Sequence, residues 1–191
     1  NSFDTAARRK VMGWAAKELP VRRLMVGTGT PSLQETIALT EHADDLGYGV
    51  ALVLPPYYYK PLSDAGLFDW YLALDEALGS RAIQVYFYNY PQMTGLSIPV
   101  QVIAELAQRA PARFTGIKDS SGNLDYCRAI VAANAALRVF PSSETALETA
   151  KVDGFAGCIS ASVNTTAPLA AQIWAQRAVP RADLCAEIAR Q

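Results

Sequence analysis

The stretch Phe114-Thr115-Gly116-Ile117-Lys118-Asp119 contains a short apolar run that ends on a lysine. Such a run, rich in β-branched and aromatic residues, is typical of a strand buried in a parallel sheet. Burial among apolar neighbours disfavours an ammonium ion and lowers the pKa of a lysine, which leaves its lone pair available for attack on a ketone. The stretch therefore predicts a buried strand that ends on a candidate covalent catalyst, Lys118.

Further runs of this kind lie on both sides of the stretch, and segments with helical spacing separate them. Apolar residues recur with that spacing at Leu67, Tyr71, Leu74 and Leu78. Strands that alternate with helices, without a series of hairpins, indicate parallel βα units. The expected strands are Leu24–Val26, Val50–Leu54, Ile83–Tyr88, Phe114–Ile117, Leu137–Phe140 and Gly154–Ile159.

Two architectures fit this α/β alternation: an open doubly wound sheet and a closed (β/α)8 barrel. Six strands do not decide between them. A complete barrel takes at least roughly 200 residues, so a chain of 191 residues predicts a partial barrel if it belongs to that class. No linker or low-complexity stretch interrupts the units, so residues 1–191 are expected to form one domain, beginning with a helix over residues 1–19.

The composition is that of a globular protein, with 51% hydrophobic residues, 18% charged residues and a net charge of -1. The basic surface of a nucleic-acid binder is absent, and no apolar run is long enough to cross a bilayer. We therefore expect a cytoplasmic protein that acts on a small molecule, without nucleic acid or membrane as a partner. The single histidine, His42, excludes a Ser-His-Asp triad and a multi-histidine metal site by counting.

Reactive side chains of a parallel α/β fold gather at the carboxyl ends of its strands. Tyr88 and Lys118 end consecutive predicted strands, and side chains on neighbouring strands start about 5 Å apart. A phenol at that distance can shuttle protons for the lysine. The alternative is that Lys118 is a surface lysine and Tyr88 a core aromatic residue with a satisfied hydroxyl.

Three segments, taken in order, resemble the dihydrodipicolinate synthase and N-acetylneuraminate lyase family: Pro55-Pro56-Tyr57-Tyr58, Tyr88-Asn89-Tyr90-Pro91 with Thr94-Gly95, and Gly116-Ile117-Lys118-Asp119. The resemblance extends from Ser2 to Trp174. It implies a (β/α)8 barrel and a class I aldolase or synthase that binds pyruvate, or another 2-oxo acid, as a lysine Schiff base, with no metal and no separate cofactor. Family members are commonly tetramers, so a homo-oligomer, dimer or tetramer, is expected.

By this resemblance, Lys118 is the Schiff-base lysine and Tyr88 the proton-relay tyrosine. Tyr58 resembles the tyrosine that reaches into the site of a neighbouring subunit. The implied substrate-binding residues are Ile159 and Ser160 at the pyruvate end of the pocket, and Ser143 and Glu144 where sugar-acid lyases contact substrate hydroxyls.

Met93 departs from the family pattern. Synthases that act on aspartate semialdehyde place an arginine there, and its guanidinium grips a second carboxylate, which methionine cannot do. The sequence therefore favours a lyase or aldolase that joins pyruvate and an aldehyde, or cleaves a 2-oxo sugar acid. The 4-hydroxy-tetrahydrodipicolinate synthase of lysine biosynthesis is the first alternative.

The chain also starts after the family's Gly-rich segment, whose adjacent hydroxyl residues hold the pyruvate carboxylate. The first two strands and most of the C-terminal helices are thus expected to be missing. An open barrel exposes sheet edges, so a catalytically incomplete barrel with a binding role is a second alternative. An unrelated phosphate-binding enzyme is disfavoured, because Gly27-Thr28-Gly29 lacks the third glycine of a dinucleotide loop and the lysine of a P-loop.

Overall fold

The computed structural model describes residues 3–177 and 181–190. Two compact units make up the chain, residues 1–115 and residues 116–191. The boundary between them falls within the strand β4 (Phe114–Asp119). That residues 1–191 form a single domain stays a prediction.

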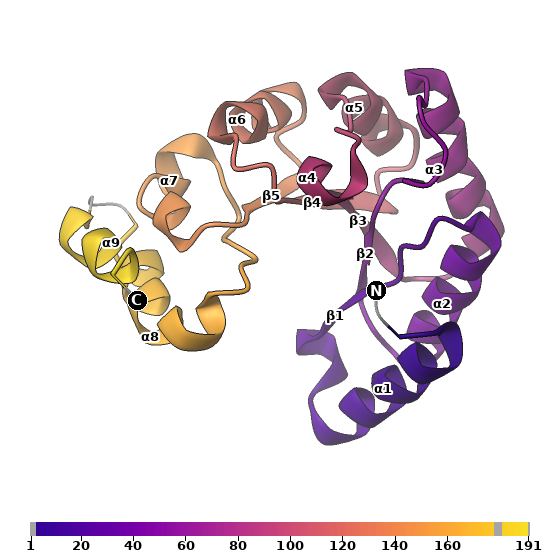
Figure 1. The fold of residues 1–191 in the computed structure, drawn as a ribbon, viewed down its shortest axis with the longest axis horizontal. Coiled ribbons are helices and arrows are strands. Elements are labelled where there is room, and N and C mark those ends of the chain that lie inside the picture. The colour runs from indigo at the N-terminus through magenta and orange to yellow at the C-terminus, as the bar shows by residue number, and fades with distance from the viewer. Residues whose placement is uncertain (1–2, 178–180, 191) are drawn as a thin grey trace. The chain divides into compact units, whose positions relative to one another are not determined.

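Unit 1 is built of three parallel strands, with helices between them. β1 pairs with β2 from Met25↔Val50 to Gly27↔Leu52, and β2 pairs with β3 from Val50↔Gln84 to Val53↔Phe87. α1, α2 and α3 pack side by side along these strands (Figure 1). The elements are α1 (Thr5–Glu18), the 3-10 helix η1 (Val21–Arg23), β1 (Met25–Gly27), α2 (Leu33–Asp45), β2 (Val50–Val53), α3 (Asp64–Leu78), β3 (Gln84–Asn89), α4 (Pro91–Thr94) and α5 (Val100–Arg109).

The helix α3 shows why these segments fold locally. Ser63 caps its first turn by accepting a hydrogen bond from the amide of Gly66 at 3.1 Å. The helix ends at Gly79, whose φ of 52° suits a residue without a Cβ. Its buried residues are Leu67, Tyr71, Leu74 and Leu78, which is the face that the sequence spacing predicts.

An aromatic cluster forms the core between α3 and the strands of unit 1. The ring of Tyr71 meets Phe87 edge to face at 4.9 Å, and Phe87 stacks on Phe114 at 5.2 Å. The hydroxyl of Tyr71 donates a hydrogen bond to the carbonyl of Val53 at 3.1 Å, so its polar end is satisfied inside the core. This packing fixes the strand β3 that carries Tyr88.

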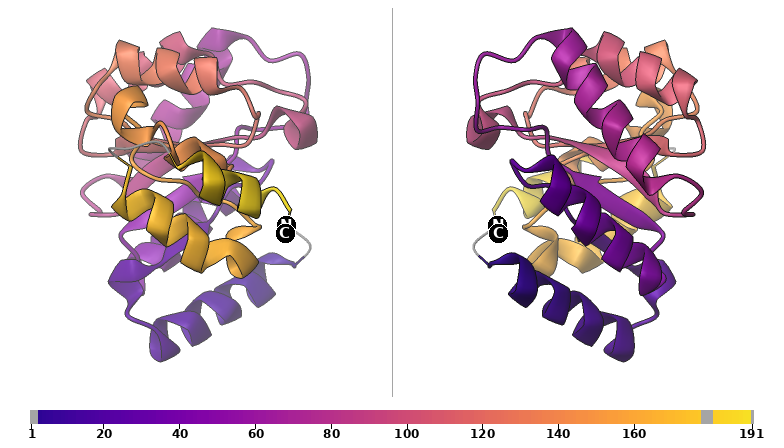
Figure 2. Two further views of the ribbon diagram at one scale, coloured as in Figure 1. Left: turned by 90° about the vertical axis from the view of Figure 1, so that its left-hand side faces the viewer. Right: turned by 90° about the vertical axis from the view of Figure 1, so that its right-hand side faces the viewer.

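Unit 2 contains the parallel pair β4 and β5, in register from Gly116↔Arg138 to Asp119↔Pro141. A separate apolar cluster joins its later helices, and α8 and α9 lie side by side within this unit (Figure 2). The members of that cluster are Leu147, Ala170, Ile173, Leu184 and Cys185. The elements that follow β4 are α6 (Leu124–Ala133), β5 (Arg138–Pro141), the 3-10 helix η2 (Glu144–Leu147), α7 (Ala150–Asp153), α8 (Val163–Ala175) and α9 (Ala182–Ile188).

The predicted strand over 154–159 is wrong, because this segment is not a regular strand. It follows β5 through two separate hydrogen bonds, from the amide of Ala156 to the carbonyl of Val139 and from the amide of Ile159 to the carbonyl of Pro141. Between these two contacts Gly157 takes a φ of 146°, which L side chains rarely adopt. The glycine interrupts the extended backbone that a continuous ladder needs.

The other predicted strands are present with boundaries moved by one or two residues, within the usual variation of strand ends. The expected helix over residues 1–19 is α1, Thr5–Glu18; residues 1–2 lie outside the described part of the chain. Within residues 3–177 and 181–190, none of the helices combines the length and the apolar character needed to span a membrane.

Candidate active site

Tyr88 is the penultimate residue of β3, at the edge of unit 1 where its parallel strands end. Its side chain is half-buried, and its ring stacks on that of Tyr90 at 5.8 Å with an interplanar angle of 21°. The next residue, Asn89, is buried, and its side-chain oxygen accepts a hydrogen bond from the amide of Ile98 at 3.0 Å. The end of β3 and the loop after it are therefore held together around Tyr88.

Met93 lies in α4, within this braced loop, and is 71% exposed. The loop closes on Gly95, which has a left-handed φ of 67°. Thr94 accepts at its carbonyl a hydrogen bond from Nζ of Lys60 at 2.9 Å, which ties the loop to the segment after β2. The position predicted to decide between substrates is thus an exposed side chain on a well-supported turn.

The tyrosines that follow β2 differ in exposure. Tyr58 is 71% exposed and Tyr59 is 83% exposed, and their rings meet edge to face at 5.0 Å. Tyr57 is half-buried and lines a cavity instead. Exposed aromatic pairs are enriched at interfaces, so the structure leaves Tyr58 available for the predicted contact with a neighbouring subunit.

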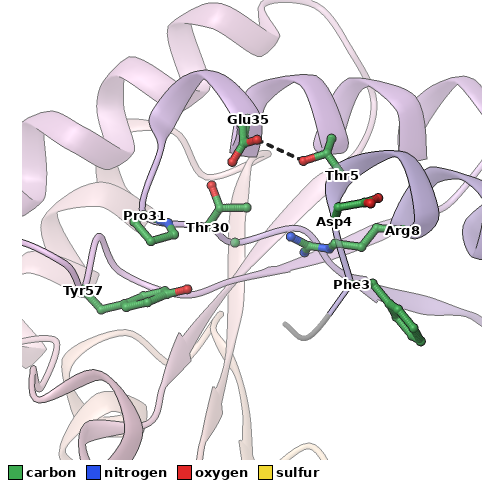
Figure 3. A pocket seen from close by; sticks show the side chains of 9 residues that line it. Phe3, Asp4, Thr5, Arg8, Thr30, Pro31, Glu35 and Tyr57 are labelled. Atoms are coloured by element: carbon green, nitrogen blue, oxygen red, sulfur yellow. Dashed lines mark hydrogen bonds between the residues drawn. The ribbon is translucent and has the colours of Figure 1, made fainter.

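The cavity beside Tyr57 has a volume of about 230 Å³ and lies at the N-terminal ends of α1 and α2 (Figure 3). The guanidinium of Arg8 and the hydroxyl of Tyr57 point toward one another, and Thr5 donates a hydrogen bond to Glu35 at 3.0 Å. Nη2 of Arg8 also donates to the carbonyl of Gly27 at 2.7 Å, which fixes α1 to the end of β1. Burial lowers the pKa of Arg8, although Tyr57 and Glu35 act to raise it.

Lys118 is the penultimate residue of β4 and is half-buried, between the buried residues Ile117 and Asp119. The carboxylate of Asp119 accepts hydrogen bonds from the amide of Ser121 at 3.2 Å and from its hydroxyl at 2.8 Å. Burial, with a smaller effect of the Asp119 charge, raises the pKa of the Cys127 thiol. Lys118 therefore lies one residue before the end of a strand whose following turn is fixed by Asp119, and its role as a Schiff-base lysine stays a prediction.

Glu144 and Ser160 come together in unit 2 through a hydroxyl that the sequence does not single out. Ser162 donates to Oε2 of Glu144 at 3.0 Å, and the hydroxyls of Ser160 and Ser162 are 2.8 Å apart. Thr166 donates to Oε1 of Glu144 at 2.6 Å. Burial acts to raise the pKa of Glu144, but hydrogen bonds from Thr166, from its own amide and from the hydroxyls of Ser162 and Ser160 outweigh it, and the pKa lies below its usual value.

Ser143 and Ile159 each make a hydrogen bond within unit 2. The hydroxyl of Ser143 accepts a hydrogen bond from the amide of Thr145 at 3.3 Å, which caps η2. Ile159 is half-buried and donates its amide to the carbonyl of Pro141 at the end of β5. The proximity of Tyr88 to Lys118, and the substrate contacts of the named residues, stay predictions.

Sequence reasoning missed Arg8, Ser162 and Thr166. Each acts on a partner at least 18 residues away along the chain. A hydroxyl or guanidinium on a helix carries no local signal of such a partner, so only the folded chain identifies these residues.

A model of the dihydrodipicolinate synthetase family matches residues 3–190 of this chain. An uncharacterized DapA-like lyase of Chloroflexus aurantiacus is 36% identical over 138 residues, which cover 72% of this chain and 46% of the relative. A 4-hydroxy-tetrahydrodipicolinate synthase of Methanococcoides burtonii is 40% identical over 132 residues, which cover 68% of this chain and 42% of the relative. The chain spans less than half the length of these two curated relatives.

Among solved structures, the chloride-inhibited dihydrodipicolinate synthase of Acinetobacter baumannii in complex with pyruvate matches with a TM-score of 0.80 and 26% identity. The match covers 98% of this chain and 63% of that chain. Together with the alternation of strands and helices, this likeness confirms the predicted fold class, α/β and part of a (β/α)8 barrel.

Proposed function

Because the chain belongs to the dihydrodipicolinate synthetase family, we propose that it is a class I aldolase or lyase in which Lys118 binds pyruvate, or another 2-oxo acid, as a Schiff base. The place of Lys118 is the observation that carries this proposal. It ends a parallel strand, half-buried between Ile117 and Asp119. Catalytic residues of (β/α)8 barrels come from such strand ends.

The proposed reaction begins when the uncharged amine of Lys118 attacks the ketone carbon of pyruvate. The carbinolamine loses water to give the imine, and loss of a proton from the adjacent methyl group gives the enamine. The enamine carbon then attacks an aldehyde, whose oxygen takes up a proton. Water hydrolyses the resulting imine, which releases the 2-oxo acid and restores the amine of Lys118, and the reverse sequence cleaves a 2-oxo acid. The imine itself is the electron sink, so the proposal includes no metal and no separate cofactor.

Tyr88 is the proposed proton relay for these steps, with Tyr58 of a neighbouring subunit as its partner. The stacking of Tyr88 on Tyr90 supports this role, because it holds the phenol at the end of β3. Ile159, Ser160, Ser143 and Glu144 remain the proposed substrate-binding residues at the strand ends of unit 2. Glyceraldehyde and related hydroxylated aldehydes are suitable test substrates.

A second candidate is the synthase that condenses pyruvate with aspartate semialdehyde. The 40% identity to the Methanococcoides burtonii protein favours it. The exposed Met93 disfavours it, because a thioether cannot pair with the second carboxylate of that substrate.

Homo-oligomerisation, as a dimer or tetramer, and a cytoplasmic location belong to the same proposal. The exposed rings of Tyr58 and Tyr59 support a contact between subunits. The three cysteines, Cys127, Cys158 and Cys185, are all free thiols, which suits a reducing compartment.

Trapping of the imine tests the proposed function. Incubation of the protein with pyruvate and sodium borohydride is expected to add one reduced pyruvate per chain, and peptide mass spectrometry is expected to place it on Lys118. Lys118→Ala should lose the adduct, whereas Lys151→Ala, at an exposed lysine of α7, should keep it. A folded protein that gives no adduct on Lys118 contradicts the proposal.

A further inference from the structure

The outer face of α1 carries a stripe of two basic side chains and one aromatic side chain. Lys10, Trp14 and Lys17 follow one another at intervals of four and three residues, so they lie on one face of the helix. Both lysines are exposed, Trp14 is 56% exposed, and Nζ of Lys10 lies 5.2 Å from the centre of the Trp14 ring. Exposed tryptophan is enriched where a protein meets a partner. We call these three residues the basic stripe.

A groove between α3 and α5 has the opposite charge. Its volume is about 310 Å³, and Phe68 and Val102 contribute apolar surface to it. The exposed carboxylates of Asp64, Asp69 and Glu105 line it as well. In the part of the chain that the structure describes, no ion pair involves any of these three carboxylates. We call this feature the acidic groove.

The helices that carry these two surfaces differ in charge over their whole length. α1 contains four basic residues and one acidic residue, whereas α3 contains four acidic residues and no basic one. Each surface also contributes an aromatic ring, Trp14 in the stripe and Phe68 in the groove. Opposite charges at the rim of a contact guide two surfaces together, and aromatic pairs add to the contact itself. The basic stripe and the acidic groove are therefore complementary.

The two surfaces are kept apart within one chain. α2 packs against both α1 and α3, so it separates the stripe from the groove (Figure 1). A contact between them therefore requires two copies, in which the stripe of one copy lies in the groove of the next. Such a contact joins different surfaces of the two copies and is heterologous.

We propose that the basic stripe of α1 docks into the acidic groove of a second copy of this chain. Lys10 and Lys17 pair with the carboxylates of the groove, and Trp14 packs against Phe68. A stripe of three residues is far smaller than the about 20–30 residues on each side of a standard interface, so the association is weak and sensitive to salt. It is separate from the contact proposed for Tyr58, and it does not depend on the proposed pyruvate chemistry.

Charge reversal on either surface tests this contact. The stripe variant, Lys10→Glu with Lys17→Glu, and the groove variant, Asp69→Lys with Glu105→Lys, each place like charges opposite one another. Sedimentation at rising protein concentration, in about 0.01 M salt, measures the association constant. Each variant should associate at least about tenfold more weakly than the native protein. Salt at about 0.15 M should weaken the native association, because it shortens the Debye length from about 30 Å to about 8 Å.

An equal mixture of the two variants should associate again. The reversed stripe of one variant meets the reversed groove of the other, and their unchanged surfaces are also complementary. Lys151→Glu with Arg190→Glu, at exposed positions of unit 2, is the matched control. It changes the net charge as much as the stripe variant does and should associate like the native protein. Circular dichroism shows whether each variant is folded.

Carbodiimide cross-linking locates the contact in the native protein, so the test does not depend on the folding of any variant. The reagent activates a carboxylate, and a lysine amine in contact with it displaces the activating group as a urea and forms an amide. Isotopically light and heavy chains are mixed before the reaction. Peptides that join Lys10 or Lys17 of a light chain to Asp64, Asp69 or Glu105 of a heavy chain are expected.

Recovery of association in the mixture, with cross-links between light and heavy chains, supports the proposed contact. Charge variants that associate like the native protein overturn it, as does a mixture that fails to recover association. Association that is lost in Tyr58→Ala but kept in both charge variants overturns it and leaves the proposed function in place. Native protein that does not associate, but binds vesicles of anionic lipid through Lys10 and Lys17, would assign the stripe to a membrane and also overturn the inference.

Discussion

Met93 is the residue whose side chain we propose separates the two candidate activities. It is 71% exposed, on a loop held by the hydrogen bond from Lys60 to the carbonyl of Thr94. Hydrogen bonds of the backbone and of Thr94 hold this loop, and the side chain of Met93 is exposed. A substitution at residue 93 should therefore change the free energy of unfolding very little. Its chemistry can therefore change the substrate without changing the fold.

Met93→Arg is expected to raise kcat/KM for aspartate semialdehyde at least about tenfold, since a charge-assisted hydrogen bond to a carboxylate is worth about 1.5–3 kcal/mol. The free energy of unfolding should change by no more than about 0.5 kcal/mol, as for other exposed positions. Steady-state kinetics with pyruvate, and urea unfolding, measure the two effects. Met93→Leu is the control, and an equal gain for glyceraldehyde would contradict a carboxylate contact.

For single residues, the sequence predicts a position in the fold only where neighbouring residues in the chain determine it. The place of Lys118 near the end of a strand could be predicted because the apolar run that forms the strand is adjacent in the chain, and its role as the Schiff-base lysine stays a prediction. The hydrogen bond from Ser162 to Glu144 could not be predicted, because the two residues are 18 positions apart in the chain. Serine hydroxyls on loops are common, and only the fold shows which of them meet a buried carboxylate.

Among the elements, helices with a buried face of regular spacing were predicted well. In α3 the buried residues repeat every three or four positions, so the pattern and the packing agree. The segment 154–159 was predicted wrongly, because its apolar residues resemble those of a strand while Gly157 breaks the extended backbone. A glycine conformation is not visible in a pattern of apolar residues.

An ion pair between α6 and α7 makes the stability of unit 2 depend on pH. Arg128 donates to both carboxylate oxygens of Asp153, at 2.9 Å and 3.1 Å. These bonds, against the opposing effect of burial and with help from Thr149, hold the pKa of Asp153 below its ordinary value. A depressed carboxyl pKa contributes stability above the unfolded-state pKa, about 3.9, and this stability is lost as the pH falls through the folded-state pKa.

Asp153→Asn is therefore expected to lower the urea midpoint at pH 7, and the difference from the native protein should shrink below about pH 4. Asp125→Asn is the matched control, because Asp125 also pairs with Arg128, at 2.8 Å, but its side chain is 89% exposed. Exposed pairs contribute about 0–1 kcal/mol. A difference for Asp153→Asn that stays constant from pH 7 to pH 3 would show that the ion pair is not its cause.

For the whole molecule, the proposed role of Tyr58 connects activity to assembly. Its side chain is 71% exposed, and its ring meets that of Tyr59 edge to face at 5.0 Å. If Tyr58 completes the site of a neighbouring subunit, the catalytic residues of one site come from two chains. Activity then depends on oligomerisation, which makes it sensitive to dilution.

Two inactive variants should therefore restore activity when they are mixed. Tyr58→Phe keeps Lys118 but lacks the phenol, and Lys118→Ala keeps the phenol but lacks the amine. In a mixed dimer with a two-fold interface, the Lys118→Ala chain supplies Tyr58 to the site of its partner, so random mixing in equal amounts gives about a quarter of the native activity. Subunits are exchanged by mild dissociation and reassembly, followed by kinetics and sedimentation. Mixed oligomers without recovered activity would show that Tyr58 acts in the site of its own chain, because neither site of a mixed dimer would then hold both Lys118 and the phenol.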